Sequence, residues 1–512
     1  MPATSSPRLQ PLFACLLLGL PALSFGATQD VRTVAVEPMS LSVEDVVALA
    51  LQNNIGLRID SFAEEVQRYT HLGTWGAFDP IASVTGSYTD SQQPAQSSLA
   101  GANVVKSDTL GLNAGLQLPF EGGGKLDLAY DHRNTSTNSS FSIDDTLTNS
   151  SLSLSYNQPL LRGAWSGYNT VEQEKSELRW DQAKARHQQL IADLERDVIH
   201  AYWNLIAARE ALGVQEETLA LGQQQLEQNR RRLKVGVGTE VEVLQAETNV
   251  ATQTEVLLRT KTNVTAADDA LKSLIFARSE TDGWSVWYAW WDRPILPTTP
   301  LPEVSDEDID WTASLASALS ARPELVQLRI DIELSEFDLL RARSEERAAL
   351  DLNLSLTSSG VDGQSNKAIE SAATFEFPTA SASLTYSTPL FNRTAESALE
   401  AARLGLRSAR LGYEQAETGI LTEVRSAVRD SRYQAEAVRA AGVSFDLATR
   451  QLEAEQARFA QGLSTNFQVL EYQQQLSQAK SNLVAARVTY AKAGTALLRA
   501  EGRLSGLSYK NE

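Results

Sequence analysis

Apolar residues recur every seven positions along four long stretches of this 512-residue chain. The first stretch carries Ile191, Val198, Leu205, Leu212, Leu219, Leu226 and Leu233. The other three run from Val243 to Leu271, from Val424 to Phe459 with a serine at position 431, and from Val469 to Leu504. A sustained period of seven predicts long helices that supercoil around their neighbours. No proline interrupts the chain from residue 162 to residue 236, so a helix there would span about 110 Å.

Six shorter segments alternate between apolar and polar residues, which predicts β-strands. They cover residues 110–118, 126–130, 152–156, 352–356 and 382–386, with a weaker segment at 81–88. Leu and Tyr share one face of each strand, and Ser, Thr, Asn, Gln or Asp share the other. Both a half-buried sheet and a transmembrane β-barrel give this pattern. In a barrel, the Ser- and Asn-rich loops at 91–107, 134–149 and 358–374 would be the extracellular turns.

The same order of segments occurs twice. The sequence from Arg232 to Gln245 matches that from Arg458 to Glu471, and Gly236 falls on Gly462 at an offset of 226 (462 − 236). Residues 154–161 match 384–391, and residues 50–57 match 318–325. A repeat of this length is too long for a solenoid. It predicts two equivalent halves that build one wall.

The two ends and the middle of the chain differ from these repeats. Residues 1–26 have the apolar run and small-residue end of a secretory signal peptide, and the only cysteine, Cys15, lies within them. No later stretch reaches 18 apolar residues, which together with the signal favours the barrel. We predict a first repeat at 27–277, a Trp- and Pro-rich segment at 278–310 packed outside the helices, a second repeat at 311–505 and a tail at 506–512. The barrel strands are expected at about 80–158 and 350–389.

Charge and motif content exclude several classes of protein. The net charge of −19 argues against a nucleic-acid partner, and it fits either a solvated acidic interior or a surface charged for solubility. The four histidines, at positions 71, 132, 187 and 200, are scattered and lack the spacing of metal ligands. The sequence has no phosphate-binding loop and no nucleophile elbow. We therefore expect no catalytic residue, cofactor or metal, and no enzyme.

Four features together resemble the TolC family of outer-membrane efflux proteins, over about residues 41–505. The first is Gly-x-x-Thr-x-x-x-Val-Leu in both halves. The second is a strand-to-helix segment at residues 158–163, with residues 388–391 as its counterpart. The third is Arg322-Pro-Glu-Leu325 at the start of the second repeat. The fourth is the repeated order of helix, strands and helical hairpin.

The resemblance implies a mainly α fold with a membrane β-barrel. Three chains would share one twelve-stranded barrel, and their helical hairpins would continue it as a periplasmic tunnel. This chain departs from that pattern, because residues 109–132 insert a hairpin around Glu121-Gly-Gly-Gly124 and raise the count to six strands. Either the barrel has more strands, or this hairpin lies outside or across it. The two transitions from strand to helix are expected at Pro159 and Pro389.

The hairpin tips carry the candidate functional residues. A glycine that tolerates a positive φ angle suits the reversal, and a threonine can cap the returning helix. The resemblance implies that these tips dock a periplasmic adaptor through eight residues: Gly236, Thr239, Val243, Leu244, Gly462, Thr465, Val469 and Leu470. It also implies an acidic aperture formed by Gln468 and Glu471. Glu242 matches the acidic member of an ion-pair lock whose basic position is Ser464 here, so the lock must differ. A solvated helix face is the alternative for these residues.

The leading hypothesis is a passive outer-membrane exit duct of a tripartite efflux or type I secretion system. Its expected partners are two further copies of the chain, outer-membrane lipid, an adaptor and an inner-membrane pump. The pump is expected to be of the resistance-nodulation, ABC or major-facilitator type. The alternative is a periplasmic coiled-coil adaptor or structural protein. The cargo and the class of pump stay open.

Overall fold

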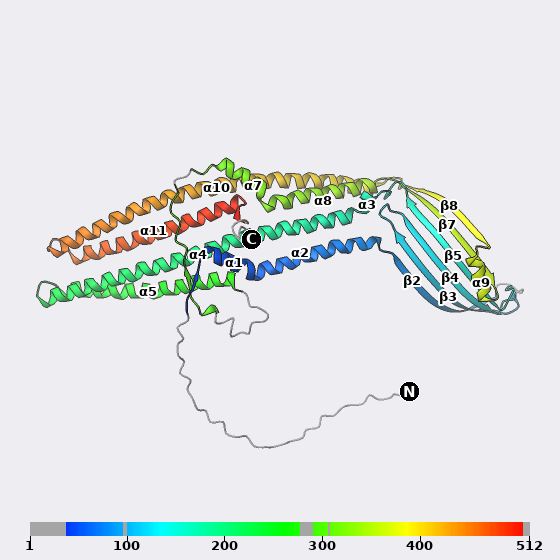
Figure 1. Ribbon diagram of the computed structural model, residues 1–512, viewed down its shortest axis with the longest axis horizontal. Helices are drawn as coiled ribbons and strands as arrows, with labels where there is room; N and C mark the ends of the chain where they lie inside the picture. Colours follow the sequence, from blue (N-terminus) through cyan, green and yellow to red (C-terminus); the bar gives the residue numbers. More distant parts are fainter. Residues whose placement is uncertain (1–36, 96–99, 277–289, 306–307, 505–512) are drawn as a thin grey trace, which may run out of the picture.

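The computed structural model describes residues 37–95, 100–276, 290–305 and 308–504. Three sequence predictions fall outside these ranges. They are the signal peptide at 1–26, the tail at 506–512, and the part of the Trp- and Pro-rich segment that holds Trp284 and Trp287. The described residues form a long rod, with a β-sheet at one end and helices along the rest (Figure 1).

The two repeats follow the chain in the same order. The first contains α1 (Val43–Asn53), α2 (Ile55–Thr74), a short 3₁₀ turn (Trp75–Phe78), β2 (Ile81–Pro94), β3 (Val104–Pro119), β4 (Lys125–Thr137), β5 (Thr146–Pro159), α3 (Ser166–Asn169), α4 (Val171–Lys234) and α5 (Glu240–Ile275). The second contains α7 (Trp311–Ala321), α8 (Pro323–Glu345), β7 (Ala349–Asp362), α9 (Ser365–Ala373), β8 (Pro378–Ser387), α10 (Arg393–Ala460) and α11 (Asn466–Ala500). Strand β1 (Met39–Leu41), at the start of the first repeat, pairs in parallel with β6 (Ile295–Pro297), which lies between the repeats.

The heptad stretches form two antiparallel helical hairpins, α4–α5 and α10–α11. Helix α4 has 64 residues and α10 has 68, so each spans roughly 100 Å. Prolines and polar caps set where several shorter helices begin. Ser42 forms a capping box with Asp45 at α1, and Pro323 occupies the first turn of α8, where its missing N–H leaves no hydrogen bond unmade.

All six predicted strands join one antiparallel sheet, in the order β2-β3-β4-β5-β7-β8. The inserted hairpin β3–β4 lies within this open sheet, between β2 and β5. The strands also extend into the predicted loops. The prediction of a loop at 358–374 is wrong, because β7 extends to Asp362 and α9 then forms and packs on β7 and β5.

The main core lies at the middle of the rod, where α1, α4 and α5 meet the β1–β6 pair. Tyr202 of α4 is fully buried; its hydroxyl donates to the carbonyl oxygen of Leu41 at 3.0 Å and accepts from the Thr299 amide at 3.0 Å. The described part of the Trp- and Pro-rich segment therefore packs on the helices, as expected. The sequence did not reveal that it holds a strand, β6.

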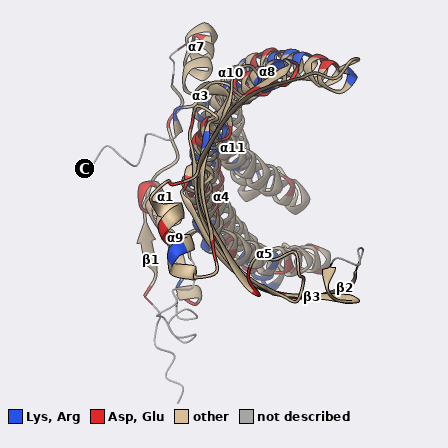
Figure 2. Ribbon diagram, turned by 90° about the vertical axis from the view of Figure 1, so that its right-hand side faces the viewer, with Lys and Arg blue, Asp and Glu red and all other residues tan. Residues whose placement is uncertain are grey.

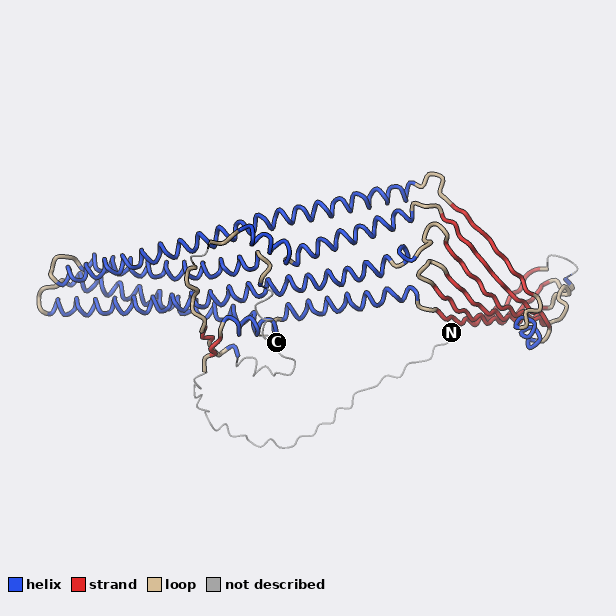
Figure 3. Tube along the Cα trace, turned by 45° about the horizontal axis from the view of Figure 1, so that its top comes forward, coloured by secondary structure: helices blue, strands red, loops and turns tan. Residues whose placement is uncertain are grey.

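The sheet and helices together form a curved wall. Viewed along the rod, they trace a C-shaped arc with α1, α7, α9 and β1 on its convex side and α11 on its concave side (Figure 2). The sheet meets the C-terminal ends of α2 and α8 and the N-terminal ends of α4 and α10, so it continues the four helices (Figure 3). In the single chain the sheet is open, with β2 and β8 as its two edges.

Candidate functional site at the hairpin tips

Both hairpins reverse at a glycine with left-handed backbone geometry. Gly236 has a φ angle of 77° and Gly462 one of 76°, and a Cβ added at either would meet nothing within 4 Å. The two glycines are therefore required for their backbone conformation rather than for close packing. This matches the turn geometry that the sequence predicted for both tips.

A threonine caps the returning helix at each tip through a capping box. Thr239 Oγ1 accepts from the Glu242 amide at 3.3 Å, and Glu242 Oε2 accepts from the Thr239 amide at 3.0 Å. Thr465 and Gln468 make the same two bonds at 3.4 and 3.2 Å. Glu242 and Gln468 are thus the third residues of equivalent helices. Their side chains hold the tips in shape, a local role that the prediction of an aperture and lock did not include.

The tip residues differ in what they present to solvent. Leu244 is 63% exposed, and Gly236, Thr239, Gly462 and Thr465 are also exposed. Val469 is completely buried against Leu452 and Phe459 inside its own hairpin. Val243 and Leu470 are half-buried. Five of the eight predicted docking residues therefore lie on the surface, while Val469 is a core residue. Further exposed apolar side chains that the sequence analysis did not single out surround them: Val235, Val237, Val241, Leu463 and Phe467.

Three buried amide side chains join the two hairpins next to the tips. Asn466 is the first residue of α11, and its Oδ1 accepts from Gln225 Nε2 of α4 at 2.8 Å and from Asn229 Nδ2 at 2.9 Å. Gln225 Nε2 also lies 3.2 Å from Asn229 Oδ1, and Asn229 Nδ2 donates to the carbonyl oxygen of Glu242 at 3.2 Å. All three residues are at most 5% exposed. We call these residues the amide cluster.

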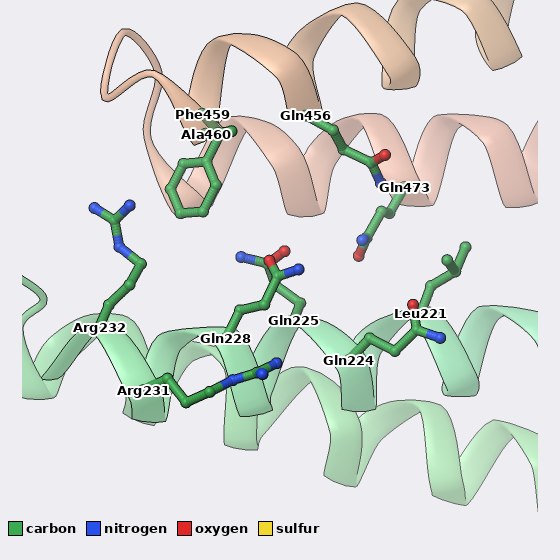
Figure 4. Close-up of a pocket in the computed structure, with 10 residues that line it drawn as sticks. All are labelled: Leu221, Gln224, Gln225, Gln228, Arg231, Arg232, Gln456, Phe459, Ala460 and Gln473. Carbon is green, nitrogen blue, oxygen red and sulfur yellow. The ribbon is translucent and has the colours of Figure 1, made fainter. Parts of the chain in front are cut away.

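A groove lined mainly by glutamines lies beside the amide cluster. Figure 4 shows Gln224, Gln225 and Gln228 rising from α4 toward Gln456 and Gln473 on the second hairpin. The cavity measures about 510 Å³. At its tip end the guanidinium of Arg232 lies 4.7 Å from the ring centroid of Phe459, a cation–π contact between the hairpins. The contacts between the hairpins at this groove are therefore polar or cation–π, and the ion pair of Lys480 on α11 with Glu217 on α4 lies farther from the tips.

Ser464 bonds within its own hairpin. Its hydroxyl donates to Glu455, a carboxylate only 4% exposed, and lies 3.0 Å from Gln468 Oε1. Arg458 also pairs with Glu455 at 3.2 Å. Glu471 lies farther along α11, exposed, with Oε1 accepting from Gln475 Nε2 at 3.4 Å. Within the single chain, Gln468 and Glu471 share α11, and Glu242 stands on the other hairpin.

The strand-to-helix transitions lie at the opposite end of the helices. Pro159 is the last residue of β5, and the next amide, of Leu160, donates to the carbonyl oxygen of Leu350 at 2.7 Å. Pro389 lies between β8 and α10, where Asn392 caps the helix with a φ angle of 34°. The side chain of Asn392 donates to the carbonyl oxygen of Glu346 at 2.9 Å. Both prolines stand where the chain leaves the sheet, as predicted.

A sequence profile described as outer membrane efflux protein matches residues 125–275 and 315–503, more than half of the chain and parts of both repeats. The chain belongs to the outer membrane efflux protein family. A comparison with curated proteins found no match.

Solved outer-membrane proteins share the fold of this family member. The CmeC outer membrane channel of Campylobacter jejuni matches with a TM-score of 0.65 and 16% identity, over 90% of this chain and 85% of that chain. The outer membrane protein VceC of Vibrio cholerae matches with a TM-score of 0.63 and 15% identity, over 90% and 96%. The open state of the MtrE outer membrane channel of Neisseria gonorrhoeae matches with a TM-score of 0.60 and 17% identity, over 90% and 88%. At these identities the likeness shows the fold.

A buried charge network explains why this family member opens its second repeat with Arg322-Pro-Glu-Leu325. Glu324 Oε1 accepts from Arg499 Nη2 at 2.6 Å, and Arg499 Nε donates to Asp193 Oδ1 at 2.9 Å. Arg322 pairs with Glu324 at 3.3 Å and with Glu423 at 2.6 Å. The network joins α4, α8, α10 and α11, and its two arginines are each 6% exposed. The sequence indicated the motif but not its partners.

The network also shifts two pKa values. Burial alone would raise the pKa of Glu324, but the hydrogen bond from Arg499 and the positive charges of Arg322 and Arg499 outweigh it and hold that pKa below its ordinary value of 4.5. Burial would lower the pKa of Arg499, but its hydrogen bonds with Asp193 and Glu324 raise it instead. Both groups are therefore charged in the folded chain at neutral pH.

Two features are absent from the described residues. Within 37–95, 100–276, 290–305 and 308–504, no three His, Cys, Asp or Glu residues are grouped so that they could hold a metal ion. In those same ranges, no helix combines the length and the apolar character that a membrane-crossing helix needs.

Proposed function

We propose that the chain is one wall segment of a trimeric outer-membrane exit duct that works with a periplasmic adaptor and an inner-membrane pump. The observation that carries this proposal is a sheet with one apolar face and two unpaired edges, continued directly by long helices. Family membership supports the same assignment. The proposal gives the chain no catalytic step, since a duct needs only a wall, an opening and a gate.

The apolar face of the sheet fits outer-membrane lipid. Leu154 of β5 stands opposite Leu128 of β4 and Leu356 of β7, and each of the three is at least 36% exposed in the single chain. Helix α9 packs on the same face near its end, over Ser358, which is fully buried, and α9 lies on the convex side of the wall (Figure 2). An exposed apolar surface of this extent needs a partner. Lipid on the convex side supplies one.

The two sides of the wall fit further copies of the chain. Helix α2 carries an exposed seam of apolar residues spaced four and three apart, each more than half exposed: Ile55, Ile59, Phe62, Val66, Tyr69 and Leu72. This spacing is that of a coiled-coil contact. On the other side of the wall α10 exposes Leu404 and Leu411, which lie seven residues apart. Packing α2 of one copy against α10 of the next would cover both surfaces, and a closed ring would leave no unpaired strand in lipid.

The hairpin tips are proposed to dock the adaptor. Val235, Val237 and Leu244 on the first tip and Leu463 and Phe467 on the second are each more than 60% exposed. Apolar side chains at the end of a helical hairpin suit a partner that brings its own helices. The adaptor would couple the duct to a pump of the resistance-nodulation, ABC or major-facilitator type.

The second hairpin is proposed as the gate. Helix α11 lies on the concave side of the wall (Figure 2), where three copies of Glu471 would face a common axis and attract cations. Moving α11 outward must separate Asn466 from Gln225 and Asn229. Because these groups are uncharged, their contribution to the closed state should depend weakly on salt. The ion-pair lock implied by the resemblance is replaced here by the amide cluster and the Arg232–Phe459 contact.

Cell fractionation and cross-linking test the proposal. The processed chain should sediment with outer membrane and cross-link as a trimer. Phe62→Asp, on the α2 seam, should abolish the trimer, whereas Ser61→Asp, beside the seam, should keep it. In planar bilayers the trimer should favour cations, and Glu471→Gln should reduce that preference. A monomer in the soluble periplasmic fraction would overturn the duct.

A further inference from the structure

The β3–β4 hairpin is a full part of the sheet rather than an attachment to it. Strand β3 pairs with β2 from Val104 to Gln117, and β4 pairs with β5 from Lys125 to Ser136. The two strands have 16 and 13 residues. A tilted strand needs about 9–11 residues to cross a bilayer. Both strands of the hairpin are therefore long enough to span the membrane beside the other four.

The hairpin continues the apolar rows of its neighbours. One row across the sheet consists of Ala82, Leu116, Leu128, Leu154, Leu356 and Ala380, one residue from each strand. Next to it, Gln117, Asp127 and Ser155 form part of a polar row on the opposite face, with Gln117 donating to Asp127 at 2.8 Å. A hairpin that lay outside or across the pore would have no need to match this alternation at both of its strands.

The turn of the hairpin is fitted to the junction of sheet and helices. Gly123 has a φ angle of 82°, and a Cβ there would lie 2.3 Å from the carbonyl oxygen of Gly163. Gln158 Nε2 donates to the carbonyl oxygen of Gly122 at 3.1 Å. Because the turn packs on the segment that follows β5, the hairpin has a fixed place between β2 and β5.

Six strands also match the helices in width. Four packed helices, with axes about 8–10 Å apart, occupy an arc of roughly 32–40 Å. Six strands about 4.8 Å apart and tilted by about 40° occupy roughly 38 Å, whereas four such strands would occupy only about 25 Å. The sheet of this chain is thus about as wide as the helical wall that it continues, with no narrowing at the junction.

We propose that all six strands of each copy stand in the membrane wall, so that three copies close an eighteen-stranded barrel. This inference rests on the proposed trimeric duct and deepens it. Strand β8 of one copy pairs with β2 of the next, the two edges that the single chain leaves open. Because barrel diameter grows with strand number, the membrane pore is about as wide as the helical tunnel, and the hairpin tips alone restrict passage.

Single cysteines in a Cys15→Ser background test the inference in outer membranes. A fluorescent probe attached to Leu116→Cys in β3 or to Leu128→Cys in β4 should be quenched by a nitroxide lipid. The quenching should be as strong as that of the same probe on Leu154→Cys or Leu356→Cys. Asp127→Cys and Ser155→Cys should instead react with a water-soluble maleimide and resist the lipid quencher. Direct imaging of the trimer in lipid nanodiscs should show eighteen strands in cross-section.

The outcomes separate this inference from the function on which it rests. Lipid contact at positions 154 and 356 without contact at 116 and 128, or a ring of twelve strands, would overturn the eighteen-stranded barrel and leave the duct standing. No lipid contact at any of the four leucines would overturn the duct itself.

Discussion

The two hairpin tips share one turn geometry but differ in how they contact the rest of the chain. Each reverses at a left-handed glycine and caps its returning helix with a threonine. At the first position of the returning helix, however, the first hairpin has Glu240, which is exposed, and the second has Asn466, which is 1% exposed and bonded to the first hairpin. The two repeats thus share the glycine and threonine that shape the tip, and they differ in the contacts that attach the tip to the other hairpin.

A second pair of equivalent positions also differs in its contacts with the other hairpin. Asn229 and Glu455 stand 226 residues apart, the offset between the tips, and both are buried. Asn229 reaches across to Asn466 of the other hairpin, whereas Glu455 bonds Ser464 and Arg458 of its own. The buried polar residue of the first hairpin thus bonds across to the second, whereas that of the second bonds within its own hairpin. The proposed gate, in which the second hairpin moves against the first, predicts such an asymmetry.

The largest loss of stability is expected at the buried charge network that joins the two repeats. Arg499→Met should leave Asp193 with only Arg196 and Glu324 with only Arg322, at a cost of about 1.5–3 kcal/mol of stability. Thermal unfolding of the purified trimer measures the loss. Arg503→Met, at an arginine that is 63% exposed, is the matched control and should change little. Equal effects of the two substitutions would mean that the buried network does not hold the repeats together.

Acid should weaken the same junction. The pKa of Glu324 is lowered in the folded chain, so its stabilising contribution is complete above its ordinary pKa of 4.5 and is lost as the pH falls below that value. Unfolding midpoints of the wild type should therefore drop as the pH is lowered from 5 toward 3. Glu324→Gln should flatten this dependence. A dependence that stays equally steep would assign the acid sensitivity to other carboxylates.

The amide cluster gives the next largest effect and tests the asymmetry directly. Asn466→Ala removes the shared acceptor of Gln225 and Asn229, at a cost of about 1–3 kcal/mol to the closed state. Single-channel conductance in planar bilayers should rise. Glu240→Ala, at the equivalent position of the first tip, should leave conductance unchanged. A rise in both variants would show that the two tips contribute alike to closure.

The turn glycines should respond equally, because here the tips are alike. Gly236→Ala and Gly462→Ala each force a side chain into left-handed geometry, at about 1 kcal/mol apiece, with open space for the methyl group. Hydrogen exchange of the tip amides should quicken to a similar degree in both variants. Protection that drops at one tip only would show that the packing around that glycine matters more than its φ angle.

The smallest effect is expected at the capping boxes. Glu242→Ala and Gln468→Ala each remove one side-chain cap, worth about 0.5–1 kcal/mol. Conductance should rise only slightly in Glu242→Ala, because that carboxylate caps its own helix. A large rise would reveal a cationic partner of Glu242 in the assembled trimer and a latch based on an ion pair.

Much of this architecture could be predicted from residue periodicity. The period of seven predicted the two long hairpins, and the period of two predicted the six strands. Both periods arise within one segment, because they reflect which side chains of a helix or strand are covered by a neighbour. Helix α9 was missed because its covered side consists mainly of two alanines, Ala368 and Ala372, in a stretch rich in polar residues. The strand-to-helix positions at Pro159 and Pro389 were predicted correctly.

The contacts that fasten the second tip could not be predicted. Gln225 and Asn466 are 241 residues apart, and each looks like part of a solvated helix face until the two hairpins are packed together. Likewise Arg322 and Glu324 stood out as a motif, but Asp193 and Arg499 carry no local signal of their role. Polar contacts between distant segments leave no periodicity in the sequence, whereas buried apolar faces do.

A cross-link between the hairpins tests the central claim most directly. In a Cys15→Ser background, Gln225→Cys and Asn466→Cys would be bridged by a short bismaleimide, with Gln215→Cys and Gln253→Cys, a hydrogen-bonded pair within the first hairpin, as the control. We expect the 225–466 bridge to block export and hold conductance low, and the 215–253 bridge to leave both unchanged. Normal export through a fully bridged 225–466 duct would contradict a gate in which the second hairpin must leave the first.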